Sequence, residues 1–163
     1  MTMRAPTLAD VPAITAIYNE GITGRQATFE TRLREPAEVQ EWLASELPFL
    51  VAEDDGAVLG WARAQPYADR CVYVGVAEFG VYVAGRARGR GVGRALLNRL
   101  ADEAEAAGLH KLTSRVFTTN APSLALHRAC GFDEVGVVRR HAKLDGEWRD
   151  CVLVERLLGE AAR

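Results

Sequence analysis

Residues 81–94 read VYVAGRARGRGVGR, and they are the most informative segment of this chain. The run of β-branched and aromatic residues at its start is typical of a strand, and the residues after it are strongly helical. Three closely spaced glycines, Gly89, Gly91 and Gly93, stand between the two. Glycines let backbone amides turn toward a ligand, and a helix N-terminus carries about half a positive charge. The segment therefore predicts a strand–loop–helix anion site suited to a pyrophosphate, with arginines adding charge.

Two familiar phosphate loops do not match this segment. A P-loop ends in Gly-Lys followed by Ser or Thr, whereas Gly93 is followed by Arg94 and Ala95. The dinucleotide pattern G-x-G-x-x-G, counted from Gly89, meets Arg94 where its third glycine is required. Two simpler interpretations stay open: a glycine turn beside a solvated basic face, and a disordered arginine–glycine run that binds RNA. The strand before the loop and the amphipathic helix after it argue against disorder.

Outward from this loop, the hydrophobic pattern predicts an α/β chain with a mixed sheet. Helices are expected from a start at residues 7–10 through Tyr18, over Glu38–Leu47, from Gly93 to Gly108, and over Pro122–Cys130. Strands are expected at Phe49–Ala52, Val58–Ala64, Val72–Val83, Leu112–Phe117, Val135–Arg140 and Cys151–Leu157, with turns at residues 54–56 and 145–146. The strand–helix–strand order within residues 72–117 implies that these two strands pair in parallel.

Size and composition fit one domain over residues 1–163 with a substantial core, since 48% of the residues are apolar. The net charge of −2 and a pI near 5.9 argue against a dedicated nucleic-acid binder. No apolar run approaches the ~20 residues that cross a bilayer, and the N-terminus lacks the apolar part of a signal peptide. We therefore expect a cytoplasmic protein that binds neither nucleic acid nor membrane.

Cysteine usage indicates a reducing compartment. The three cysteines, Cys71, Cys130 and Cys151, are odd in number, far apart, and not arranged as a C-x-x-C pair. Their apolar neighbours predict buried, inert thiols and no metal site.

A second motif, at residues 120–132, reads NAPSLALHRACGF. It resembles the N-x-x-[A/S]-x-x-x-[Y/H]-x-x-x-G-F segment of the GCN5-related N-acetyltransferase superfamily. Independently, the spacing Arg88-x-x-Gly91-x-Gly93 resembles the coenzyme A loop of that superfamily. The two matches lie at the expected separation, which makes the resemblance strong.

Nearly the whole chain resembles one subgroup, the phosphinothricin and methionine-sulfoximine acetyltransferases. The matching positions are Tyr18-Asn19, residues 27–30 (ATFE), Glu78, His127 and residues 143–150 in the form K-x-x-G-x-W-x-D. The chain departs from the subgroup at residues 76–78, which read VAE instead of the usual TVE, and at residues 72–75 (VYVG). Both departures face the acceptor side in the subgroup.

The resemblance implies a GNAT-like α/β fold: a mixed, mostly antiparallel central sheet flanked by helices, with a splayed strand pair at the cofactor cleft. It implies acetyl-CoA as co-substrate, no metal, and a homodimer. The implied reaction is acetyl transfer to the primary amine of a small amino-acid-like substrate such as phosphinothricin or methionine sulfoximine. Transfer is expected to be direct, because Cys71 and Cys130 show no paired His–Asp signature for a covalent route.

The same resemblance assigns residues to coenzyme binding. On the strand these are Val81, Tyr82 and Val83, whose main-chain groups hold the thioester carbonyl and the pantetheine arm. In the loop they are Arg88, Gly89, Arg90, Gly91, Val92, Gly93 and Arg94. Asn120 and Ser123 are expected on the pantetheine chain; a helix N-cap is the alternative for Asn120, and solvated surface for Ser123.

Acetyl transfer to an amine requires a base, because an ammonium group has no lone pair. Glu78 is the candidate, and its apolar neighbours in sequence favour partial burial and a base that works near neutral pH. From pattern alone, a solvent-facing strand glutamate is the simpler reading. His127 is the candidate proton donor to the leaving thiolate, with a structural histidine as the alternative.

Four further residues are candidates for the acceptor side: Phe29, Glu30, Arg70 and Tyr73. Arg70 lies eight residues before Glu78, and a guanidinium binds a carboxylate or phosphinate through two parallel hydrogen bonds. An ordinary loop arginine beside Asp69 is the alternative. Trp61 and Trp148 are expected in the core or at an interface.

Three rival functions stay open. The chain would acetylate another amine, such as a polyamine, a protein N-terminus or an antibiotic; or it would bind coenzyme A without catalysis; or it would bind nucleic acid through the arginines of its loop.

Overall fold

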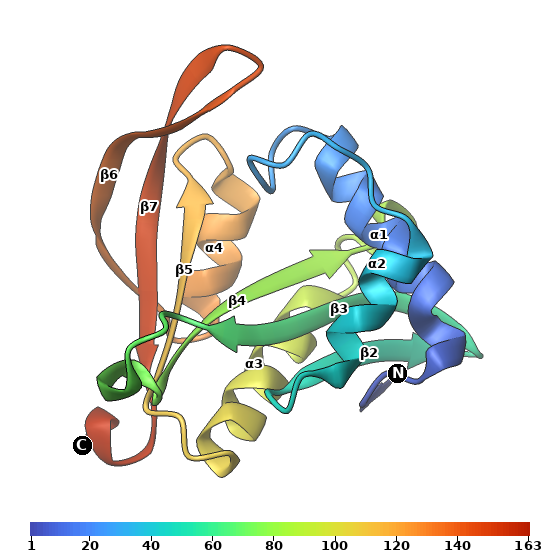
Figure 1. Cartoon of the computed structure of the whole chain (residues 1–163), viewed down its shortest axis with the longest axis horizontal. Coiled ribbons are helices and arrows are strands. Elements are labelled where there is room, and N and C mark those ends of the chain that lie inside the picture. The colour runs from blue at the N-terminus through green and yellow to red at the C-terminus, as the bar shows by residue number, and fades with distance from the viewer.

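Seven strands form one sheet in the order β1-β2-β3-β4-β5-β7-β6, and the computed structural model describes all residues 1–163 (Figure 1). The strands are β1 (Thr2–Arg4), β2 (Phe49–Asp54), β3 (Ala57–Pro66), β4 (Val76–Val83), β5 (Lys111–Phe117), β6 (Asp133–Leu144) and β7 (Glu147–Leu157). The helices are α1 (Val11–Thr23), α2 (Pro36–Gln40), α3 (Val92–Ala106) and α4 (Ala121–Ala129). All neighbouring strands are antiparallel except β4 and β5, which are parallel. The predicted fold class is confirmed.

Local sequence signals account for most element boundaries. Pro12 lies in the first turn of α1, where its missing N–H costs nothing. Helix α3 begins after Gly91 and is followed by Gly108, and both glycines have positive φ. The β2–β3 and β6–β7 hairpins turn at Asp-Gly pairs, 55–56 and 145–146, in which both residues have positive φ, as a type I′ turn requires.

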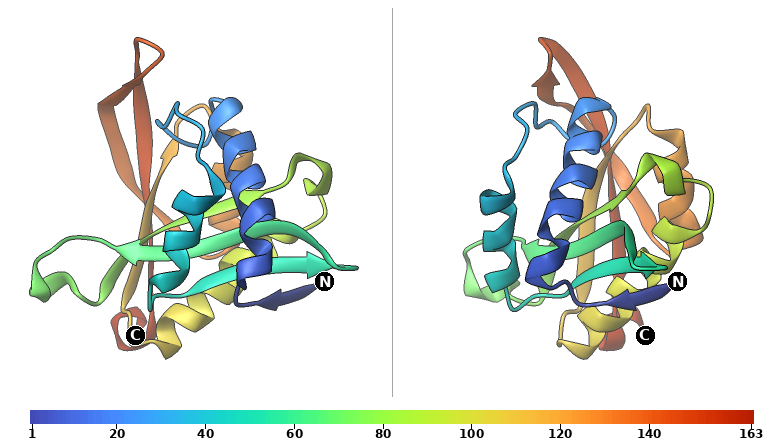
Figure 2. Two further views of the ribbon diagram at one scale, coloured as in Figure 1. Left: turned by 45° about the vertical axis from the view of Figure 1, so that its right-hand side comes forward. Right: turned by 90° about the vertical axis from the view of Figure 1, so that its right-hand side faces the viewer.

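The helices cover both faces of the sheet. Helices α1 and α2 lie on one face and α3 and α4 on the other (Figure 2). Side chains of β4 alternate between these faces: Phe79 packs against His127 and Phe132 near α4, whereas Tyr82 stacks on Tyr18 of α1. The face that carries α1 and α2 is called the α1 face below.

The parallel pair β4–β5 is short and then opens. Its partners run only from Val76↔Lys111 to Glu78↔Thr113, although β4 continues to Val83 and β5 to Phe117. Beyond this point β4 stays paired with β3, and β5 stays paired with β7. The sheet is therefore two antiparallel halves that share three rungs and then diverge (Figure 1), which confirms the expected splayed pair.

Three sequence predictions need correction, and one strand was missed. The strand expected over Val72–Val83 begins only at Val76, because residues 71–73 form a 3-10 turn whose apolar side chains are exposed and meet no neighbouring strand. The helix expected over Glu38–Leu47 is shorter: α2 starts at Pro36 and gives way to a 3-10 turn over Glu41–Ala44. Strand β1 was not predicted. Cys130 and Cys151 are buried as expected, but Cys71 is exposed.

None of the helices combines the length and apolar character needed to cross a bilayer. No group of three or more His, Cys, Asp or Glu side chains is placed to hold a metal ion.

Candidate active site

A cleft of about 650 Å³ lies where β4 and β5 diverge. Its walls come from five segments: the end of α1 with the loop after it, β4, the glycine loop, β5, and α4. Asn120 closes one corner, since its side chain donates to the carbonyl of Gln26 at 3.0 Å. Glu20 closes another by accepting from the amide of Gly85 at 2.8 Å. Sequence reasoning missed Glu20 and Gln26, because contacts across about 65 and 94 residues leave no local pattern.

The glycine loop presents unpaired amides at the N-terminus of α3. The backbone N–H groups of residues 89–94 donate to no acceptor in the protein. Gly89 and Gly91 have φ values of 75° and 79°, a conformation that other residues adopt at a cost. Gly93 is constrained by packing instead, since a Cβ there would lie 3.2 Å from Leu126 Cδ2 and the leucine would have to shift by a few tenths of an ångström. Unpaired amides at a helix N-terminus are the features that an anion site requires.

The loop arginines divide into two groups. Arg88 and Arg94 line the cleft and form no ion pair. Arg90 instead pairs with Asp54 of the β2–β3 turn at 3.3 Å, and Arg86 donates to the carbonyl of Val58 at 2.9 Å. Of the three loop arginines expected at the cleft, two therefore line it.

Strand β4 offers main-chain groups to the cleft. The carbonyl of Phe79 accepts a hydrogen bond from Ser114 Oγ at 3.1 Å, so the peptide groups of Phe79 point toward β5. By alternation, the peptide groups of Val81 and Val83 point the same way, into the gap beyond the last paired rung. Tyr82 is placed differently: its backbone faces β3, and its ring stacks on Trp61 at 4.8 Å.

Asn120, Ser123 and His127 follow one another along α4. Asn120 caps the helix by accepting from the Ser123 amide at 3.2 Å, so its N-cap alternative holds. His127 is buried against Phe79 and Phe132 and places Nδ1 2.6 Å from the Ser123 carbonyl. Burial lowers the pKa of His127 below its ordinary value. The hydrogen bond places the proton of this neutral ring on Nδ1 and leaves Nε2 as an acceptor.

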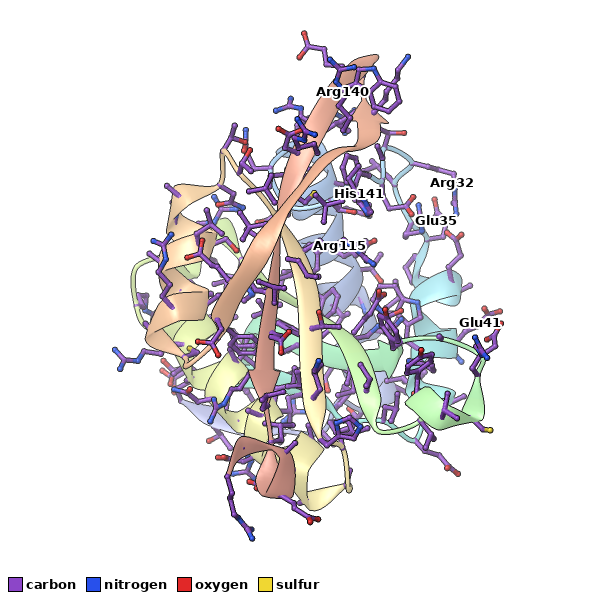
Figure 3. The ribbon with its side chains drawn as sticks, turned by 90° about the vertical axis from the view of Figure 1, so that its left-hand side faces the viewer. Arg32, Glu35, Glu41, Arg115, Arg140 and His141 are labelled. Carbon is purple, nitrogen blue, oxygen red and sulfur yellow. The ribbon has the colours of Figure 1, made fainter.

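Glu78 occupies the last paired rung of β4 and points to the α1 face, opposite to Phe79. Its Oε1 accepts from Arg115 Nη1 at 3.0 Å, and the two side chains are 35% and 38% exposed. The partial burial expected from sequence is therefore found, with the carboxylate held in an ion pair that the sequence did not predict. Arg115 was missed because a strand arginine 37 residues away carries no motif. Figure 3 shows Arg115 beside β5, with His141 beyond it toward the tip of the β6–β7 hairpin.

The four acceptor candidates do not gather in one place. Phe29 packs edge-on against Phe117 with ring centroids 4.8 Å apart, and Glu30 pairs with Arg34 at 2.9 Å. Both lie in the connection after α1. Arg70 and Tyr73 lie instead in the β3–β4 loop, which extends away from the body of the molecule (Figure 2, green). Tyr73 there contacts only the ring of Tyr67 among aromatic partners, at 5.8 Å.

Comparison with known proteins agrees with this geometry. Residues 14–132 match the model of the Acetyltransferase (GNAT) family. Phosphinothricin N-acetyltransferase of Alcaligenes faecalis is 40% identical, over 96% of this chain and 82% of that protein. L-methionine sulfoximine/L-methionine sulfone acetyltransferase of Pseudomonas paraeruginosa is 33% identical, over 94% of this chain and 92% of that protein.

Solved structures give the same answer. The crystal structure of a GNAT superfamily phosphinothricin acetyltransferase from Sinorhizobium meliloti, in complex with acetyl-CoA, matches with a TM-score of 0.92 and 34% identity, over 98% of this chain and 89% of that one. The unpaired amides of the glycine loop and the open edge of β4 fit acetyl-CoA as the co-substrate. The chain belongs to the GNAT acetyltransferase family and is an acetyl-CoA-dependent N-acetyltransferase.

Proposed function

We propose that the protein transfers the acetyl group of acetyl-CoA directly to the primary amine of a small amino-acid-like substrate of the phosphinothricin or methionine sulfoximine type, with Glu78 as the general base. The observation that carries the proposal is the position of Glu78 at the apex of the β4–β5 opening, next to the cleft that holds the unpaired loop amides. Relatives named for these two substrates, at 40% and 33% identity, support the substrate class.

On the coenzyme side, the amides of residues 89–94 bind the pyrophosphate, and Arg88 and Arg94 add charge. The peptide groups of Val81 and Val83 bind the pantetheine arm and the thioester carbonyl, where a fixed N–H stabilises the negative charge that develops on oxygen. Asn120 and Ser123 line the same cleft. No step requires a covalent intermediate on the protein.

On the acceptor side, Glu78 takes one proton from the ammonium group, directly or through a water molecule. The freed amine attacks the thioester carbonyl, a C–N bond forms, and the C–S bond breaks. The new amide nitrogen loses a second proton, and the thiolate of coenzyme A takes up a proton. One proton is released overall, because the ammonium gives up two and the thiolate receives one.

His127 as the proton donor to the thiolate stays a prediction, and the hydrogen-bond geometry counts against it. A donor requires a proton on the nitrogen that faces the cleft, whereas the proton of the neutral ring is held on Nδ1 by the Ser123 carbonyl. Solvent at the open cleft supplies this proton equally well.

Homodimerisation and a cytoplasmic location belong to the same proposal. Exposed apolar side chains on the β3–β4 loop, Val72, Tyr73 and Val74, are consistent with a covered surface in a dimer. Light scattering on the purified chain measures the assembly: a mass near twice that of the chain supports a dimer, and the mass of one chain contradicts it.

Release of free thiol from acetyl-CoA tests the reaction. The acceptor panel holds phosphinothricin, L-methionine sulfoximine, L-methionine sulfone, spermidine, a peptide with a free N-terminus and an aminoglycoside. We expect turnover with the amino-acid analogues, and a fall in kcat of about 100-fold or more in Glu78→Gln. Glu134→Gln is the matched control, because Glu134 is also a strand glutamate paired with an arginine, but its partner Arg128, unlike Arg115, does not line the cleft.

Each alternative outcome has a distinct meaning. Full turnover in Glu78→Gln removes Glu78 as the base. Turnover with spermidine or the peptide alone moves the acceptor to another amine class. Tight acetyl-CoA binding without thiol release from any acceptor favours a non-catalytic coenzyme A-binding protein.

A further inference from the structure

Arg115 has unused hydrogen-bond donors beside the candidate base, Glu78. Its guanidinium makes one hydrogen bond within the protein, from Nη1 to Glu78 Oε1, while Nε and Nη2 donate to no protein group. Arg115 also lines the cleft. A guanidinium has five N–H donors in a planar fork that fits a carboxylate, so most of this capacity is free. A partly exposed ion pair of this kind is weak and exchanges readily with other charged groups.

Three other arginines on this side of the sheet, Arg63, Arg34 and Arg70, form no ion pair with Glu78, and Arg149 of β7 has a buried Nε without a hydrogen-bond partner. Arg63 lies over the ring of Trp42 at 4.3 Å and donates to Gln65 at 2.8 Å. Arg34 pairs with Glu30 at 2.9 Å. Arg70, the arginine that sequence reasoning favoured for an anionic acceptor, lies on the extended β3–β4 loop. Arg115 is thus the guanidinium in direct contact with Glu78.

The cleft extends to the residues beside this pair, because Gly80 and Arg115 both belong to its lining. Gly80 lies two residues beyond Glu78 on the same face of β4, and the ring of Tyr82 covers the position where a side chain of Gly80 would lie. A Cβ at Gly80 would lie 3.2 Å from Tyr82 Cε2. A small acceptor whose amine reaches Glu78 also lies within reach of Arg115, because the two side chains are in contact at 3.0 Å.

We propose that Arg115 binds the carboxylate of the acceptor, and that the Glu78–Arg115 pair forms the recognition site for the zwitterionic head of a free α-amino acid. This inference rests on the proposed function and narrows its substrate class. An α-amino acid carries an ammonium and a carboxylate on one carbon atom. The pair presents the opposite polarity, a carboxylate and a guanidinium joined at 3.0 Å. The ammonium meets Glu78, which takes its proton, while the carboxylate meets the free donors of Arg115.

The arrangement also selects against other amines. A polyamine brings a second positive charge toward Arg115, and like charges at close range oppose binding. A peptide N-terminus or an amino-acid amide has no carboxylate on the carbon that bears the amine, so Arg115 gains no partner. Arg115 thus determines specificity for the acid, whereas Glu78 acts on the amine of any acceptor that enters.

The test compares one acid with its amide. L-methionine sulfone and its carboxamide carry the same amine and side chain and differ in the carboxylate alone. We expect the native enzyme to prefer the acid by at least about 10-fold in kcat/KM, the size of one charge-assisted pair. In Arg115→Met, KM for the acid rises about 10- to 100-fold and the preference between the two substrates disappears. Arg115→Gln serves for the same measurement if the methionine variant does not fold.

Two further arginine variants make the result specific. Arg139→Met removes an exposed arginine of β6 that makes no contact with the cleft, and it keeps the preference for the acid. Arg70→Met tests the rival anion site. Retention of the preference in Arg115→Met, or its loss in Arg70→Met alone, overturns the inference while the proposed function stands. Failure of the native enzyme to acetylate either substrate overturns the proposed function, and this inference with it.

Discussion

The hydroxyl of Ser114 donates to the carbonyl of Phe79 at 3.1 Å, across the first rung where β4 and β5 no longer pair. A side chain here takes the place of the amide that a continuous sheet would supply. The bond satisfies the last β4 carbonyl before the gap, and it marks where the shared part of the sheet ends and the cleft begins.

Ser114→Ala removes this bond and leaves the carbonyl of Phe79 without its protein partner. The expected loss is about 1 kcal/mol in the free energy of unfolding, because water at the cleft replaces part of the bond. For a chain of this size, this corresponds to a fall in Tm of roughly 2–4 °C. Urea unfolding measures the loss in free energy, and thermal unfolding measures the fall in Tm. Because the amides of Val81 and Val83 are unaffected, KM for acetyl-CoA should change less than about 3-fold; a large change in KM with unaltered stability would assign the hydroxyl to the coenzyme instead.

Gly91 should prove essential to coenzyme binding through its backbone conformation. Its φ of 79° is unfavourable for alanine, and the space around a Cβ is empty, so Gly91→Ala acts through the backbone and not through a clash. We expect KM for acetyl-CoA to rise about 10-fold as the loop amides turn away from the pyrophosphate. Gly108→Ala is the matched control: Gly108 has φ of 87°, empty space around it, and a place at the other end of α3. Equal effects of the two substitutions on KM would show general strain in the helix rather than a role of the loop.

The loop arginines should differ in function as they differ in contacts. Arg88→Gln and Arg94→Gln each remove an unpaired charge from the cleft, and we expect KM for acetyl-CoA to rise about 10-fold, with a weaker dependence on salt. Arg90→Gln removes an arginine that is paired with Asp54 outside the cleft, and it should change KM less than about 3-fold. Steady-state kinetics at two salt concentrations measures all three. A larger effect from Arg90 than from Arg88 would reverse this assignment.

Local sequence patterns were enough to predict the elements whose structure depends on residues close together in the chain. The glycine loop, helix α3 and the two Asp-Gly hairpins follow from glycines that permit positive φ and from helical periodicity. The splay of β4 from β5 came instead from the family resemblance. It results from each strand keeping its antiparallel partner, β3 or β7, over its whole length. Pairings of this kind join distant residues and leave no periodic signal.

The absence of a local signal for long-range contacts also explains why the partner of Glu78 was not predicted. The apolar neighbours of Glu78 correctly indicated partial burial, but Ala77 and Phe79 point to the opposite face of β4, and Arg115 of β5 meets the carboxylate. Residues 72–74 have the composition of a strand and yet are exposed, because no strand runs beside them. Composition indicates which secondary structures a segment can adopt, whereas the neighbouring strands and helices decide which of them forms.

His127 should matter for packing more than for proton transfer. His127→Phe keeps an aromatic ring between Phe79 and Phe132 and removes both ring nitrogens. Because Nε2 carries no proton in the neutral ring, we expect kcat to fall less than about 10-fold, whereas loss of a general acid costs about 100-fold or more. Thiol release across pH 6–9 measures this. His127 would be the acid after all if kcat of His127→Phe fell about 100-fold and if kcat of the native enzyme depended on a single ionisation in this pH range.

The same substitution should change how stability depends on pH. Burial lowers the pKa of His127 in the folded protein below the ordinary value of 6.5. Between the folded and the unfolded pKa, the unfolded chain binds a proton that the folded protein does not, so the free energy of unfolding falls as the pH falls. The stabilisation is complete above pH 6.5 and is lost as the pH drops through the folded pKa, at up to about 1.4 kcal/mol per pH unit.

Urea unfolding at pH 7.5 and pH 5.5 should therefore show a smaller loss in His127→Phe than in the native protein. The carboxylate of Asp10 does not mask the effect, because the Arg4 hydrogen bonds lower its pKa and its contribution is lost only at more acidic pH. Equal losses in the two proteins would mean that the buried ring accepts a proton in place, and Nε2 would then regain the proton that an acid requires.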